Sequence, residues 1–209
     1  MTASQGVFAY GVVEGTVDKT VLACLMSHTH VTSVALHVAN GKPHIRQRLD
    51  GYNNAARISP WIVLVDLDTE ADCAPALCRQ WLPEPSPHMR LRVAVRTVEA
   101  WLLADRERFA KFLGVRQESL PKDPEAILHP KQEVVALARQ SRRRAIREDM
   151  VPRPGSGRAV GPAYASRLIE FVSDPTRGWR PDVAAQHSDS LCRCVKSLRQ
   201  LAARGGSSE

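Results

Sequence analysis

Acidic residues stand at the ends of two apolar runs of the sequence. Glu14 ends the first run and Asp18 follows four residues later, which is about one turn further along a helix. Asp66 and Asp68 end a second run, and strand alternation would place both side chains on one side. Any one of these acids alone could be a helix cap or a surface group. Together they would repel one another without a cation, so the set predicts a site for Mg2+ or Mn2+.

The segments around these acids alternate between strand and helix patterns. The unbroken apolar run at 61–67 is typical of a strand buried in a parallel sheet. Strands are predicted at 5–13, 31–38, 61–67 and 91–95, and helices at 16–26, 71–81 and 98–104. This alternation predicts an α/β fold with a mostly parallel central sheet flanked by helices. Sites in such sheets form beyond the carboxyl ends of the strands, and this rule adds Glu99 to the four acids.

The second half of the chain has a different pattern. No convincing strand follows residue 114, and helices are predicted at 131–147, 164–172 and 188–203. We therefore expect a sheet domain over 1–114, a helical C-terminal lobe over 115–204 and a disordered tail over 205–209. The segment 151–162 is rich in Pro, Gly and Arg. Its motif Gly155-Ser156-Gly157-Arg158 lacks the phosphate-loop pattern and follows no strand, which favours a flexible linker.

Two motifs carry a resemblance to a known family. Val13-Glu14-Gly15-Thr16-Val17-Asp18, followed by an apolar strand that ends in Asp66-Leu67-Asp68, resembles the Toprim domain. This domain is shared by topoisomerases, bacterial primases, small rRNA-maturing nucleases and OLD-type nucleases. Thr97-Val98-Glu99 is similar to the Ser-x-Glu that OLD-type nucleases carry after the next strand, with threonine in place of serine. The run from Glu99 to Asp105 also resembles small bacterial Toprim-like proteins.

The resemblance implies a Toprim-like fold and a nuclease that uses two metal ions, Mg2+ or Mn2+, to cut phosphodiester bonds. In such a mechanism the ions activate a water and stabilise the leaving oxygen. The implied metal ligands are Glu14, Asp18, Asp66, Asp68 and Glu99. The implied catalytic residues are Glu14, Asp66, Asp68, Glu99 and Lys131, the last as the lysine that assists the scissile phosphate. Arg96 is a second candidate for that assistance.

The charge of the chain suits a polyanionic partner. Lys and Arg number 29 against 22 Asp and Glu, which gives a formal charge of +7. Much of the excess lies late in the chain and could equally be a solvated helix surface. The residues that we expect to contact a nucleic acid backbone are Arg96, Arg142, Arg143, Arg144 and Arg147. The sequence leaves DNA and RNA open. It also leaves open a catalytically weak Toprim-like binding or toxin-antitoxin module and an rRNA-maturing endonuclease.

The cysteines and the apolar stretches predict where in the cell the protein acts. Five cysteines form no CxxC pair, and the longest apolar stretches are far shorter than the roughly 20 residues of a membrane span. We therefore expect a cytoplasmic protein that does not enter a membrane, with its oligomeric state open. OLD-type nucleases work with an ATPase domain, and this chain carries no ATPase motif. The resemblance thus implies a separate ATPase partner in a bacterial anti-phage system.

Overall fold

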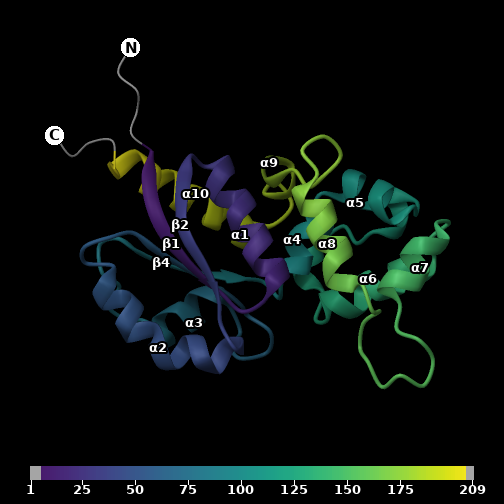
Figure 1. The fold of residues 1–209 in the computed structure, drawn as a ribbon, viewed down its shortest axis with the longest axis horizontal. Coiled ribbons are helices and arrows are strands. Elements are labelled where there is room, and N and C mark those ends of the chain that lie inside the picture. Colours follow the sequence, from purple (N-terminus) through teal and green to yellow (C-terminus); the bar gives the residue numbers. More distant parts are fainter. Residues whose placement is uncertain (1–5, 206–209) are drawn as a thin grey trace, which may run out of the picture.

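Four parallel strands form the central sheet in the order β2-β1-β3-β4, as the computed structural model shows for residues 6–205 (Figure 1). Each pair of neighbouring strands is parallel. The strands are β1 (Val7–Val13), β2 (Val31–Val38), β3 (Trp61–Asp66) and β4 (Met89–Ala94). This confirms the predicted α/β class, with a sheet that is wholly parallel.

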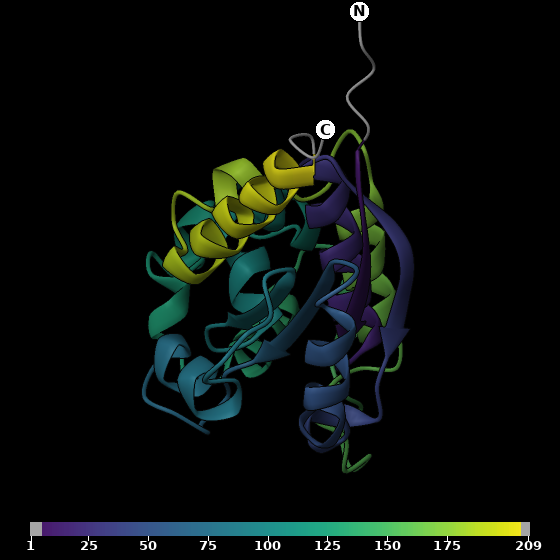
Figure 2. The ribbon, with the colours of Figure 1, turned by 90° about the vertical axis from the view of Figure 1, so that its left-hand side faces the viewer.

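Helices cover both faces of this sheet because the central strands are apolar on both sides. On β3, Ile62 and Leu64 belong to one buried cluster, whereas Val63 and Val65 belong to another. The second cluster is closed by α2 (Gly41–Ala55) and α3 (Ala74–Trp81). On the opposite face lie α1 (Thr16–His28) and α10 (Asp189–Gly205), as Figures 1 and 2 show. The unbroken apolar run of β3 is therefore explained by burial from two sides.

The remaining helices form the C-terminal helical region beside the sheet (Figure 1). They are α4 (Val98–Ala104), α5 (Arg106–Leu113), α6 (Pro130–Arg139), α7 (Arg144–Met150), α8 (Tyr164–Ser173) and α9 (Pro181–Ala184), with short 3-10 turns at Gln117–Ser119 and Pro124–Ala126. The larger buried cluster joins residues from both sides of position 114, including Leu22 of α1, Trp101 of α4 and Leu198 of α10. The helical region and the sheet therefore share one core.

The helix expected over 131–147 is wrong as a single element, because α6 ends at Arg139 and α7 begins at Arg144. The break is caused by Ser141, which is buried between them. Its hydroxyl donates to the carbonyl of Leu113 and accepts from the main-chain N–H of Arg143. This side-chain turn replaces the helical hydrogen bonds at that point.

The last helix extends through Gly205, the first residue of the expected tail, and residues 206–209 lie outside the described part of the chain. Within the described residues, no helix has the length and apolar character needed to cross a membrane.

Candidate metal centre

The carboxyl ends of β1, β3 and β4 meet at one edge of the sheet. Val13 is level with Leu64, and Asp66 is level with Ala94. The residues that follow these strands are therefore brought together although they are far apart in sequence. Glu14 lies directly after β1, Asp66 ends β3, and Glu99 lies in the first turn of α4, just beyond β4.

Asp66 is the centre of this group. Its carboxylate is buried, and its Oδ1 accepts a hydrogen bond from the main-chain N–H of Val98 at 3.0 Å. Its own N–H donates to Glu14 Oε1 at 2.8 Å, so β1 and α4 are both joined to the end of β3. Asp18 lies beside them in the first turn of α1, and its buried Oδ1 has no hydrogen-bond partner among the described residues. A buried carboxylate oxygen without a donor is costly unless a cation or a solvent molecule meets it.

Glu99 is held from three directions. The hydroxyl of Thr97 donates to its Oε2 at 2.6 Å, and the hydroxyl of Tyr164, at the start of α8, donates to its Oε1 at 3.3 Å. Lys131, at the start of α6, places Nζ 4.0 Å from the same Oε1. Only 1% of the Glu99 side chain is exposed, whereas 57% of Lys131 is. Lys131 therefore lies at the surface with its ammonium next to the buried Glu99 carboxylate.

Asp68 does not follow the predicted strand alternation. Its φ of 50° lies in the left-handed region, because β3 ends at Asp66 and the chain turns after it. Asp68 Oδ2 accepts from Lys42 Nζ at 2.6 Å, and Glu70 lies 3.6 Å from the same ammonium. Asp68 thus faces α2 and is half-exposed, while Asp66 is buried beside α4. Burial alone would lower the pKa of Lys42, but the bond to Asp68 and the charge of Glu14 outweigh it and raise the pKa.

Burial and like charges act together on the acids of this edge. Burial is the largest cause that raises the pKa of Glu14, Asp18, Asp66 and Glu99. The negative charges of Asp18, Glu99 and Glu14 raise the pKa of Asp66 further, to well above its usual value. The pKa of Lys131 is raised because the charges of Glu99, Asp66 and Asp18 outweigh its burial. The acids are thus close enough to repel one another, and the charge of each disfavours ionisation of the others.

The donor set suits a hard divalent cation. Carboxylate oxygens are the ligands that Mg2+ and Mn2+ prefer. Asp18 Oδ1 is such an oxygen, and no hydrogen-bond donor of the described residues occupies it. In the described part of the chain, no three His, Cys, Asp or Glu side chains are already arranged as a complete metal cage. The residues fit a metal centre by the chemistry of their carboxylates, although the described side chains do not form one as they stand.

The predicted arginines are less available than their sequence suggests. Arg96 donates to the carbonyl of Asp68 at 3.0 Å, Arg143 to that of Phe112, and Arg147 to that of Ser141. Arg144 pairs with Glu148 at 2.7 Å. Arg142 is exposed and has no side-chain partner among the residues described. Four of these five guanidinium groups therefore already bind their own chain.

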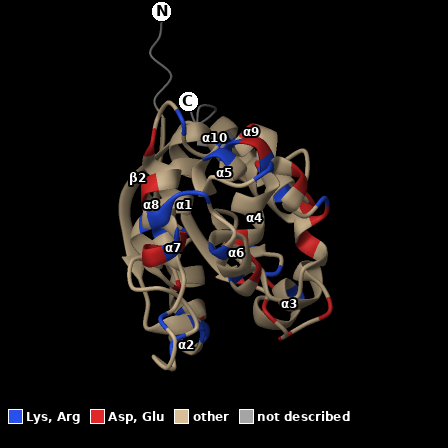
Figure 3. Cartoon of the chain, turned by 90° about the vertical axis from the view of Figure 1, so that its right-hand side faces the viewer, with Lys and Arg blue, Asp and Glu red and all other residues tan. Residues whose placement is uncertain are grey.

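Sequence reasoning missed Lys42 and Tyr164. Lys42 lies just beyond the carboxyl end of β2, so the rule that sites form beyond strand ends applies to this lysine as well as to the acids. Figure 3 shows basic residues on α2 and at α6, on the elements that carry Lys42 and Lys131. Tyr164 touches Glu99 across 65 positions of sequence, and no local pattern indicates that contact.

Comparison with protein-family models, with curated proteins and with solved structures gives no match.

Proposed function

We propose that this chain is a metal-dependent nuclease that hydrolyses phosphodiester bonds in DNA or RNA, with Mg2+ or Mn2+ as its cofactor. One observation carries this proposal. Glu14, Asp18, Asp66 and Glu99 are gathered at one sheet edge with raised pKa values, and a buried oxygen of Asp18 has no partner among the described residues. A divalent cation would relieve the repulsion and satisfy that oxygen.

Each residue has a role in this proposal. Glu14, Asp18 and Asp66 would hold one cation. Glu99 would hold a second together with Asp68, whose carboxylate would first have to leave Lys42. Two cations held by these residues would supply an activated water and would stabilise the leaving oxygen of the displacement.

The neighbouring polar groups orient the carboxylates and offset negative charge. Thr97 fixes the direction of the Glu99 carboxylate through its hydroxyl. Lys131 pairs with Glu99 at 4.0 Å and is still mostly exposed, so its ammonium could also contact a phosphate and offset the charge that builds on it. Arg96 already holds the backbone of Asp68, which makes it a support of the loop after β3.

The test uses the full chain with supercoiled plasmid and with structured RNA, each in Mg2+, Mn2+ or EDTA. We expect cutting of one substrate class with metal and none in EDTA. Asp66→Ala and Glu14→Ala should abolish cutting and also lower the heat of Mn2+ binding in calorimetry. Asp189→Ala, which removes an exposed acid on α10, is the matched control and should change neither. Cutting that persists in Asp66→Ala, or the absence of cutting with every metal, would contradict the proposal.

A second candidate function is supported by the two lysines. Lys42 and Lys131 already lie against the acids, so the carboxylates have internal counter-ions. A catalytically weak Toprim-like binding or toxin-antitoxin module could use the same network for assembly. Such a module predicts no cutting and no rise in Tm with Mn2+. Cutting restricted to one structured RNA would instead favour an rRNA-maturing endonuclease.

We also propose that the nuclease acts in the bacterial cytoplasm in an anti-phage system, beside a separate ATPase. The ATPase partner is supported by the resemblance to OLD-type nucleases alone. All five cysteines are free thiols, which suits a reducing compartment. The ATPase proposal is tested by the genes that flank this one and by co-purification of their products. A neighbourhood without any ATPase gene would contradict it.

A further inference from the structure

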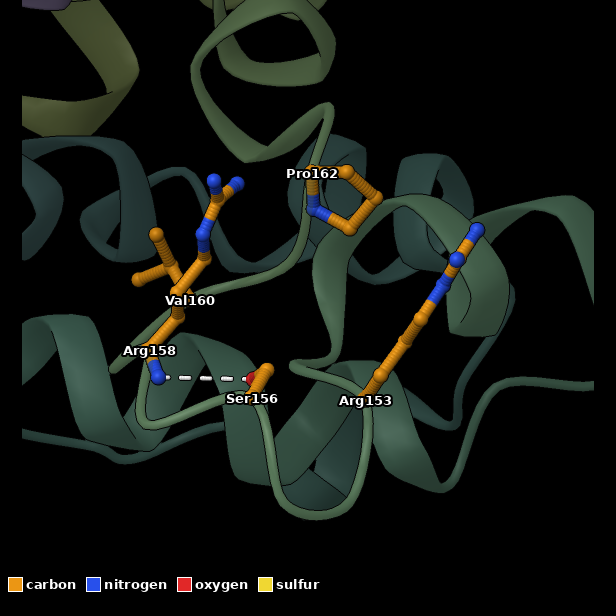
Figure 4. Close-up of a pocket in the computed structure, with 5 residues that line it drawn as sticks. All are labelled: Arg153, Ser156, Arg158, Val160 and Pro162. Atoms are coloured by element: carbon orange, nitrogen blue, oxygen red, sulfur yellow. Dashed lines mark hydrogen bonds between the residues drawn. The ribbon is translucent and has the colours of Figure 1, made fainter.

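The loop between α7 and α8 carries a cluster of arginines that the metal centre does not use. Arg153 and Arg158 line one pocket of this loop together with Ser156, Val160 and Pro162 (Figure 4). A second pocket, on the same loop, is lined by Arg153 and Arg158 and also by Arg139 from the end of α6. Neither pocket is lined by an acidic residue.

These three arginines differ from Arg143, Arg144 and Arg147, whose guanidinium groups already bind their own chain. Arg139, Arg153 and Arg158 are exposed, and within the described residues their guanidinium groups have no hydrogen-bond or ion-pair partner. Figure 4 shows Arg153 and Arg158 on opposite limbs of the loop, with Pro162 between their side chains. Three unpaired guanidinium groups without an acid beside them attract an anion, and planar donors of this kind bind phosphate well.

The loop is closed at its base, so the arginines are presented on a defined turn. The N–H of Gly161 donates to the carbonyl of Met150 at 3.0 Å, and the N–H of Ala163 donates to that of Asp149 at 2.9 Å. At the tip, the N–H of Arg158 donates to the Ser156 hydroxyl at 3.3 Å, which Figure 4 draws as a dashed line. A Cβ on Gly161 would lie 2.4 Å from the Asp149 carbonyl oxygen, so only glycine allows this closure.

Two elements connect this arginine loop to the metal centre. Tyr164 follows the loop directly and contacts Glu99. Helix α6 begins next to Lys131 at the centre and ends at Arg139 beside the loop. Eight residues of helix separate Lys131 from Arg139, which is about 12 Å. At about 3.4 Å per nucleotide of a strand, this distance corresponds to roughly three or four nucleotides.

We propose that Arg139, Arg153 and Arg158 bind the phosphate backbone of the nucleic acid about three or four nucleotides from the bond that is cut. The stated distance to the cut bond rests on the proposed nuclease activity. The binding itself depends only on the arginines. The contacts would be with phosphates and not with bases, so they would hold many sequences equally.

The test measures binding of labelled 20-nucleotide single-stranded DNA, duplex DNA and single-stranded RNA in EDTA, across a range of salt concentrations. Arg153→Gln/Arg158→Gln should lower the slope of log affinity against log salt by about 1.8 for a duplex, or about 1.4 for a single strand. At 0.1 M salt this is a loss of about 60-fold or about 25-fold, and little should be lost at 1 M. The three substrates show whether DNA or RNA is preferred.

The matched control is Arg193→Gln/Arg199→Gln, which removes the same charge from two exposed, acid-paired arginines of α10 and should leave the slope nearly unchanged. Equal losses in both double variants would show diffuse charge attraction and overturn the proposal, as would unchanged binding in Arg153→Gln/Arg158→Gln or no binding by the wild type. Loss of binding confined to that variant, in a protein that cuts nothing with any metal, would support the arginine loop and refute the nuclease. An unchanged thermal melt shows that the variants fold.

Discussion

The hydroxyl of Tyr164 is one of the two hydroxyl groups that position Glu99, and its removal tests whether that carboxylate takes part in metal binding. Tyr164→Phe keeps the ring in its buried place and removes only the bond of 3.3 Å to Glu99 Oε1. A hydrogen bond to a charged group contributes about 1.5–3 kcal/mol. At 3.3 Å the bond is long for O–H···O, so we take the lower value, ~1.5 kcal/mol.

That free energy corresponds to about a tenfold change in an equilibrium constant. It matches the lower end of the 10–100-fold loss in metal affinity that is typical when a group orienting a ligand is removed. We therefore expect Tyr164→Phe to weaken Mn2+ binding about tenfold in isothermal titration calorimetry. Tyr52→Phe is the matched control, since Tyr52 stacks on Trp61 with ring centroids 5.3 Å apart and its hydroxyl has no hydrogen-bond partner among the described residues. Equal Mn2+ affinity of Tyr164→Phe and wild type would refute the positioning role.

Three further predictions concern charges. The pKa of Asp66 in the folded protein is raised well above the ordinary value of 3.8. The stabilisation linked to the protonated Asp66 is therefore fully present below pH 3.8, and it is lost as pH rises through the folded pKa. Without metal, Asp66→Asn should therefore unfold at a higher urea concentration than wild type at pH 7.5, with the difference vanishing towards pH 4. Asp105 is fully buried and paired with Arg180 at 2.6 Å, so Asp105→Ala should cost about 3–5 kcal/mol and lower Tm by roughly 6–20 °C in calorimetry. Lys42→Gln frees Asp68 from a cation at 2.6 Å, so Mn2+ affinity should rise while metal-free Tm falls; a fall in affinity would contradict this.

Local pattern was sufficient for most elements of the fold. The strand expected at 31–38 and the helix expected at 98–104 have those bounds in the structure, because β-branched runs and helical apolar spacing depend on near neighbours. The break between α6 and α7 depends instead on the bond from Ser141 to Leu113, which lies 28 residues earlier. A contact of that kind has no signature in the segment that it interrupts.

The residues of the candidate site also differ in whether local pattern could predict them. The strand-end rule placed Glu14, Asp66 and Glu99 near one another, and the structure brings them together. Asp68 turned away because β3 ended two residues before it, which period-two alternation does not detect. The tyrosine on Glu99 comes from a helix distant in sequence and could not be predicted. Cutting, metal binding and the roles of these residues remain predictions.

The position of Glu99 shows why the helices beyond residue 114 matter to the metal centre. Helix α4, which carries Glu99, is buried along its whole length. Trp101 Nε1 donates to Ser190 Oγ of α10 at 2.7 Å, and Trp179 Nε1 donates to the Trp101 carbonyl at 3.1 Å. The Asp105 and Arg180 pair holds the end of the same helix. Repulsion among the acids would push Glu99 outward. These contacts oppose that movement, so the C-terminal helices complete the site that the sheet edge begins.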